Sequence, residues 1–97
     1  MGKYVLLGNW TDQGVREVKD TVKRSRAARE AFAALGVNAR EWFFTLGQYD
    51  VVLTVDAPDD ETLTKATLAL AMQGSLRTTT LRGFSEKEME GLLSALP

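Results

Sequence analysis

The chain has 97 residues, twelve Lys and Arg against thirteen Asp and Glu, a net charge of -1, and no Cys or His. The absence of Cys and His excludes a disulfide framework, a thiolate nucleophile, an imidazole base and the usual zinc sites. The near-neutral charge argues against nucleic acid or anionic membrane as a partner. Its first apolar run, Tyr4–Leu7, is too short for a signal peptide or a membrane span. We therefore expect one domain, residues 1–97, in the cytoplasm, with no metal or cofactor.

The first third of the chain predicts a strand followed by a long helix. The segment Tyr4–Trp10 is rich in residues that favour strands, and Thr11 can cap the helix that follows. We expect this helix to run unbroken to Leu35, with Gly36 as its left-handed stop. Its apolar positions recur every three or four residues, at Val15, Val18, Val22, Ala28, Phe32 and Leu35. A basic cluster, formed by Lys23, Arg24, Arg26 and Arg29, could bind an anion but is more typical of a solvated face.

The middle of the chain predicts a β-hairpin with strands Val37–Leu46 and Tyr49–Val55. Gly47 and Gln48 would form a type II′ turn, because glycine tolerates the positive φ of its first central position. Counting from this turn sets Phe44 opposite Val51. Alternation then predicts a core wall of Trp42, Phe44, Leu46, Tyr49, Val51, Leu53 and Val55. The mixed face would carry Glu41, Phe43, Thr45, Asp50, Val52 and Thr54.

The last third predicts a helix, a strand and a second short helix. The acidic segment Asp56–Glu61 would end the hairpin strand and begin a helix that stops at Gly74. This segment could also bind a hard cation, but it lacks the alternating spacing of such loops. The segment Ser75–Gly83 predicts a threonine-rich strand that is polar enough to lie at a sheet edge or to line a wet cavity. Ser85 and Glu88 form a capping box at the start of the final helix.

This order of elements predicts an α+β fold of the ferredoxin-like βαββαβ kind, with a C-terminal helix. The four-stranded antiparallel sheet would have the order 4-1-3-2, and both long helices would cover one face. The uncovered face would carry Phe43, Val52 and one alternate set of the first strand, either Tyr4, Leu6 and Trp10 or Val5 and Leu7. Because such a surface is larger than soluble monomers normally expose, we expect a homodimer that pairs sheet to sheet, or a higher oligomer of such dimers.

The hairpin also carries a family resemblance. The motif Gly47-Gln48-Tyr49-Asp50, together with residues 11–15, 45–51, 57–60 and 76–82, resembles the GYD domain family of small bacterial and archaeal proteins. The resemblance extends over nearly the whole chain, and its motifs are specific only in combination. It implies a ferredoxin-like fold of the dimeric α/β barrel kind, and it implies no settled activity.

Asp50 is the first candidate for a functional residue, because the register places it on the mixed face beside Thr45. Partial burial there would make it a general base or an anchor for a ligand. Alternatively, Asp50 only accepts hydrogen bonds from Thr45, Gln48 or turn amides. Tyr49 is expected in the core wall, and Gly47 is structural in either case.

These residues leave three functional hypotheses. The leading one is a non-enzymatic homo-oligomer that binds a small, partly apolar ligand between two sheets. Its cavity would be lined by Phe43, Thr45, Asp50, Val52 and Thr54. The second is a cofactor-free oxygenase or isomerase that uses Asp50 as base and Asn9 or Arg82 as electrophilic partner. The third is a purely structural interaction domain without a cavity.

Overall fold

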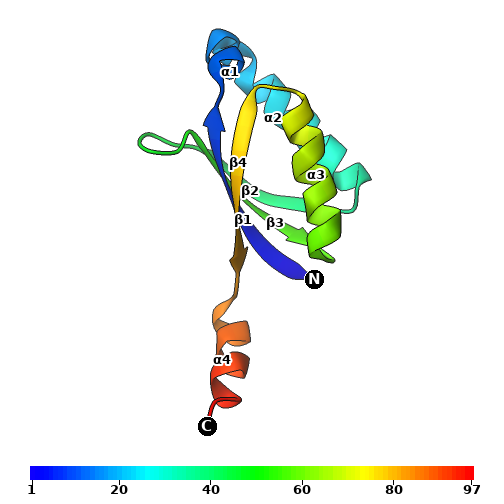
Figure 1. Cartoon of the computed structure of the whole chain (residues 1–97), viewed down its shortest axis with the longest axis vertical. Helices are drawn as coiled ribbons and strands as arrows, with labels where there is room; N and C mark the ends of the chain where they lie inside the picture. The colour runs from blue at the N-terminus through cyan, green and yellow to red at the C-terminus, as the bar shows by residue number, and fades with distance from the viewer.

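The computed structural model describes residues 1–97 and shows a four-stranded antiparallel sheet with two helices packed on one face (Figure 1). The strands are β1 (Gly2–Trp10), β2 (Asn38–Phe44), β3 (Val51–Ala57) and β4 (Leu76–Gly83). The helices are α1 (Asp12–Arg16), α2 (Thr21–Ala34), α3 (Asp60–Met72) and α4 (Glu86–Ser94), with a 3₁₀ turn, η1 (Val18–Asp20), between α1 and α2. The sheet order β2-β3-β1-β4 is the predicted order, read from the other edge.

The core lies between the sheet and the helices α2 and α3. Leu6 of β1 and Leu53 of β3 are paired with each other and are both fully buried. Phe32 of α2 and Leu63 of α3 pack into the same cluster. Strand alternation therefore turns the odd-numbered residues of β1 to the opposite side. We call that side the open face, and its residues are Lys3, Val5, Leu7, Asn9, Glu41, Phe43, Val52, Thr54, Asp56, Arg77, Thr79 and Leu81.

The predicted unbroken helix from Thr11 to Leu35 is wrong, because the chain bends at Glu17 and η1 before α2 begins. The first turn is held at the end of the sheet, where Thr11 donates its backbone N–H to the Ser75 carbonyl at 3.1 Å. Gly14 packs so closely there that a Cβ would lie 2.1 Å from the same oxygen. One straight helix cannot keep this contact and also cross the sheet. The predicted apolar stripe consequently fails at Val15, Val18 and Val22, which are exposed.

The β2–β3 hairpin has the predicted register but not the predicted turn. Phe44 pairs with Val51 and Trp42 with Leu53. Instead of a two-residue type II′ turn, residues 45–50 form a longer loop that extends beyond the sheet (Figure 1). The expected core positions in this segment are also wrong, since Leu46 is fully exposed, Phe44 is exposed and Tyr49 lies outside the core cluster. Gly47 keeps the expected positive φ, at 128°.

The strand β3 does not end at Val55 as predicted but continues through Asp56 to Ala57. A β-bulge in β2 accommodates this longer pairing, because Ala39 pairs with Val55 and Glu41 with Thr54, so that Arg40 is the extra residue. Such a bulge redirects its side chain, and here it brings Arg40 to the Asp56 carboxylate.

The rest of the acidic segment begins α3 as expected. The Asp59 side chain caps the helix by accepting the Thr62 N–H at 2.7 Å. Asp60 accepts the Tyr4 hydroxyl at 2.5 Å, which ties β1 to the helix start. This hydrogen bond is the main cause that raises the pKa of Tyr4 above its ordinary value.

The C-terminal helix α4 extends from the end of β4, apart from α2 and α3 (Figure 1). Its predicted capping box is present, with Ser85 and Glu88 bonded reciprocally. Its apolar side chains Met89, Leu92, Leu93 and Leu96 are all exposed. None of the helices is both long and apolar enough to cross a membrane.

Candidate functional site

Asp50 serves as a hydrogen-bond acceptor at the end of β1. Its carboxylate accepts the backbone N–H of Trp10 at 3.0 Å. Its own N–H donates to the Gly8 carbonyl at 2.9 Å, and its carbonyl accepts the Thr45 N–H at 2.8 Å. Asp50 therefore satisfies backbone groups where β1 leaves the sheet. Its carboxylate accepts from Trp10 rather than from Thr45, Gln48 or a turn amide as predicted, whereas Thr45 bonds to its backbone carbonyl.

Asn9 and Thr45 are engaged in holding the 45–50 loop. The Asn9 amide donates to the Gln48 carbonyl at 3.0 Å, and the Thr45 hydroxyl donates to the Tyr49 carbonyl at 2.5 Å. Both side chains thus bond to loop carbonyls. Gln48 takes part in this network through its backbone, so its own side chain is not required for it.

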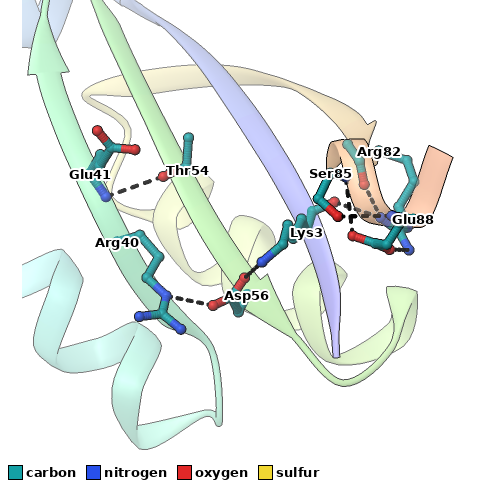
Figure 2. Close-up of polar contacts among 9 residues, drawn as sticks. Lys3, Arg40, Glu41, Thr54, Asp56, Arg82, Ser85 and Glu88 are labelled. Carbon is teal, nitrogen blue, oxygen red and sulfur yellow. Dashed lines mark hydrogen bonds and ion pairs between the residues drawn. The ribbon is translucent and has the colours of Figure 1, made fainter. Parts of the chain in front are cut away.

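Arg82 lies far from Asp50 and Asn9. It pairs with Tyr4, five positions along β1 from Asn9, which corresponds to about 17 Å of strand. It also lies on the helix-covered side, where it stacks over the rings of Tyr4 and Phe84. Its guanidinium is 3.7 Å from the Glu88 carboxylate (Figure 2). A single chain therefore does not assemble Asp50, Asn9 and Arg82 into one site.

The five residues predicted to line a cavity are divided between two places. Phe43, Val52 and Thr54 share the open face, and Phe43 pairs directly with Val52. Thr45 and Asp50 lie at the loop, where their polar groups are engaged as described. Thr54 accepts the Glu41 N–H at 3.2 Å and lines an open groove of about 510 Å³ at the lower end of the open face (Figure 2).

An ion cluster lies beside this groove, and the sequence analysis did not foresee it. The nearly buried Asp56 carboxylate is 2.5 Å from Arg40 Nε and 3.6 Å from Lys3 Nζ (Figure 2). The hydrogen bond from Arg40, aided by both positive charges, holds the pKa of Asp56 below its ordinary value despite burial. The cluster depends on the β2 bulge, and no residue in the sequence marks that bulge.

A second feature missed by the sequence analysis is a cavity between α2, α3 and the sheet. It has a larger part of about 220 Å³ between the helices and a smaller part of about 40 Å³ against the sheet. The two parts share Arg24, Ala28, Leu70 and Ser75. Trp10 and Trp42, the only tryptophans of the chain, both line the smaller part. The alanines of α2 and α3 are the available sequence signal, because small residues leave space between helices.

Comparison with known proteins places this geometry in context. The model of the GYD domain family matches residues 4–93. A Thermus thermophilus protein named "Glutamine synthetase and cystathionine beta-lyase binding protein" is 34% identical over 82 residues, which cover 84% of this chain and 86% of the relative.

Two solved structures resemble the chain. TTHA0845 from Thermus thermophilus is 28% identical, with a TM-score of 0.56, over 88% of this chain and 95% of that one. MtbAldR is 17% identical, with a TM-score of 0.68, over 88% of this chain and 52% of that one. The chain therefore spans about half the length of MtbAldR, and that likeness concerns the fold alone.

Proposed function

The chain belongs to the GYD domain family, whose model matches residues 4–93, and from this premise we propose that it is a non-enzymatic binding module that works as a homodimer. The two copies pair through their open faces. The observation that carries this proposal is the apolar centre of the open face, for which the chain has no covering helix.

The apolar centre runs across all four strands. Phe43 of β2 is 54% exposed and pairs with Val52, which in turn pairs with Leu7 of β1. Next to this row, Val5 of β1 pairs with Leu81 of β4, which is 47% exposed. Removing apolar surface from water stabilises an assembly by about 25 cal/mol per Å². A continuous row of this kind is therefore a strong driving force for association.

A second copy suits this face because the charges around it are of both signs. Arg77 lies on the edge strand β4 and Glu41 on the other edge strand, β2, whereas Lys3 and Asp56 already pair with each other within one chain. A two-fold axis brings the same patch of both copies together, and it can set the basic side of one against the acidic side of the other. Sheets that pack face to face in this way lie about 10 Å apart.

The assembled dimer would hold a small, partly apolar ligand between its sheets. Phe43 and Val52 supply an apolar wall, and Thr54 supplies a hydroxyl at the groove of about 510 Å³. Thr45 and Asp50 lie in the 45–50 loop beyond this face and would form a polar rim of the space between the sheets. The ion cluster of Asp56 closes the opposite end.

An enzyme is the partner suggested for the outer surface of the dimer. The Thermus relative carries the name of a binding protein for glutamine synthetase and cystathionine beta-lyase. The exposed Leu46 at the loop tip and the apolar side chains of α4 are available for such contacts. Calorimetric titration with purified glutamine synthetase tests this part, because heat release should be lost when Leu46 is replaced by Ser.

The oligomeric state tests the proposal itself. We expect a dimer, or an even-numbered assembly, in light scattering at micromolar concentration. The Phe43→Ser variant should shift to monomer, because a hydroxyl then faces the partner's apolar surface. The matched control is Leu68→Ser, since Leu68 is 59% exposed on α3, away from the open face. A monomeric parent protein would contradict the proposal.

A further inference from the structure

We propose that the cavity between α2, α3 and the sheet binds a small, mostly apolar molecule that carries one hydrogen-bond-accepting oxygen, such as an aryl amide or carboxylate. We call this cavity the helix-side cavity. It lies on the covered side of the sheet, opposite the open face, so the inference stands independently of the proposed dimer.

The walls of the helix-side cavity are built from small and apolar side chains. Phe32 and Leu70 form part of its lining. Both helices present alanines to the space between them, namely Ala27, Ala28 and Ala31 of α2 and Ala66 and Ala69 of α3. A methyl group cannot cross the gap between the helices, and so the gap stays open. An apolar cavity of about 150 Å³ already accommodates benzene, and the larger part of this cavity has about 220 Å³.

Two polar side chains that line this cavity, Ser75 and Trp42, form no side-chain hydrogen bond within the protein. Ser75 is 9% exposed and lines both parts of the cavity. Its carbonyl accepts the Thr11 N–H, and its hydroxyl lies at the cavity surface, where a bound molecule can reach it. The Nε1–H of Trp42, whose side chain lines the smaller part, is buried without an acceptor. An unpaired buried donor destabilises the fold, so an acceptor oxygen that reaches the Trp42 Nε1–H would satisfy it.

Arg24 adds a positive charge at the rim. It lines both parts of the cavity and forms an ion pair with Glu17, so its charge is largely neutralised. A neutral amide therefore fits the cavity at least as well as a carboxylate, which would have to compete with Glu17. The expected ligand therefore has an aromatic or branched apolar group and a carbonyl oxygen that points to Ser75 and Trp42.

The two tryptophans make the test direct. Because Trp10 and Trp42 both line the cavity and the chain has no other tryptophan, a bound molecule should change its intrinsic fluorescence. Three probes separate the contributions of the apolar ring, the carbonyl oxygen and a negative charge. Toluene has the ring alone, benzamide adds a neutral carbonyl oxygen, and benzoate adds a charged carboxylate. Ligands of this size reach dissociation constants on the order of 1 mM. We expect benzamide to bind at least about threefold more tightly than toluene, which corresponds to part of one hydrogen bond.

Variants of the full chain locate the binding. Ala69→Leu fills the cavity, and it should weaken benzamide binding by about tenfold or more. Ala31→Leu fills the cavity from α2 and should weaken benzamide binding in the same way. It replaces Ala69→Leu in the test if that variant does not fold. The matched control is Ala33→Leu, because Ala33 is exposed on α2 and does not line the cavity. Trp42→Phe removes the donor and leaves Trp10 as the fluorescent reporter, so benzamide should lose its advantage over toluene while toluene binding persists.

Three results would overturn the inference. The first is no fluorescence change with any probe up to its solubility limit. The second is equal binding by the Ala69→Leu and Ala33→Leu variants, since the probes would then bind elsewhere. The third is a Leu92→Ser variant that binds benzamide about tenfold more tightly than the parent protein. That result would mean that α4 of a second copy normally fills the cavity and competes with benzamide. Chemical shifts of the amides in α2 and α3 should move with benzamide if the inference is correct.

Discussion

The two faces of the sheet are made by the same strands but end in different environments. On the covered face, Leu6 and Leu53 are inaccessible to solvent beneath α2 and α3. On the open face, their neighbours Leu7 and Val52 stay partly accessible, and Phe43 is more than half exposed. Since β1 and β3 are apolar on both sides, the difference arises from how many helices the chain has and where they pack.

This comparison shows that a strand can be apolar for two separate reasons. On one side the apolar residues stabilise the chain's own fold, and on the other they are available to another molecule. The α4 helix could have covered the open face, yet it extends away from the sheet with its own apolar side chains exposed. The molecule therefore carries two uncovered apolar surfaces, the open face and the apolar side of α4.

The largest expected effect compares two adjacent residues of β3. Leu53→Ala should lower the free energy of unfolding by about 3 kcal/mol, because it leaves a cavity in a fully buried site. Val52→Ala should cost less than about 1 kcal/mol when the protein is dilute. Its cost should grow with protein concentration, because binding of a partner is linked to stability. Urea unfolding at several concentrations measures both, and equal costs at all concentrations would refute the distinction between the faces.

A smaller effect is expected at the lower end of the open face. Asp56→Asn should lower the free energy of unfolding at neutral pH by about 1 kcal/mol, a modest value because Arg40 and Lys3 are more than half exposed. The pKa of Asp56 is lowered in the fold, so its stabilisation is present above the unfolded value of about 3.9 and is lost as pH falls through the folded value.

Unfolding measured from pH 6 down to about pH 2 checks the sign of this linkage. The parent protein should lose more stability than Asp56→Asn as the pH falls below about 4. Both proteins should still show some loss there, because Asp59 and Glu88 also have lowered pKa values. Parallel curves for the two proteins would show that the ion cluster does not stabilise the fold.

The smallest effect is expected at the other end, where Asp50 accepts the Trp10 N–H. Asp50→Asn keeps an acceptor oxygen and should change the free energy of unfolding by less than about 0.5 kcal/mol, whereas Asp50→Ala should cost about 1 kcal/mol. Thermal unfolding of both variants distinguishes these values. If Asp50→Asn lowers the free energy of unfolding as much as Asp50→Ala does, then the negative charge of Asp50 stabilises the fold. Its interpretation as a neutral hydrogen-bond acceptor would then be wrong.

Local patterns were sufficient to predict much of this architecture. The pairing of Phe44 with Val51 followed from counting through Gly47. It survived the change of turn because the longer loop takes the same number of residues from each strand. The caps at Thr11 and Ser85 and the stop at Gly36 were also predicted correctly, because each depends on residues within one helical turn. The order of the four strands followed from the order of elements.

Contacts between distant segments decided the rest. The break before α2 depends on the packing of Gly14 against Ser75, which are 61 positions apart in the sequence. Asp50 points to Trp10 because β1 ends beside the loop, and Arg40 reaches Asp56 because β2 carries a bulge. The helix-side cavity exists because two rows of alanine meet.

The sequence by itself thus determined which residues alternate, cap and turn, since these depend on near neighbours. Only the tertiary structure decided which face of the sheet the helices cover, and so which apolar residues remain free to bind a partner. The apolar spacing of the helical segment could not have predicted which of its residues are buried. Val18 and Val22 follow the same three- and four-residue spacing as Phe32, yet they are exposed and Phe32 is buried.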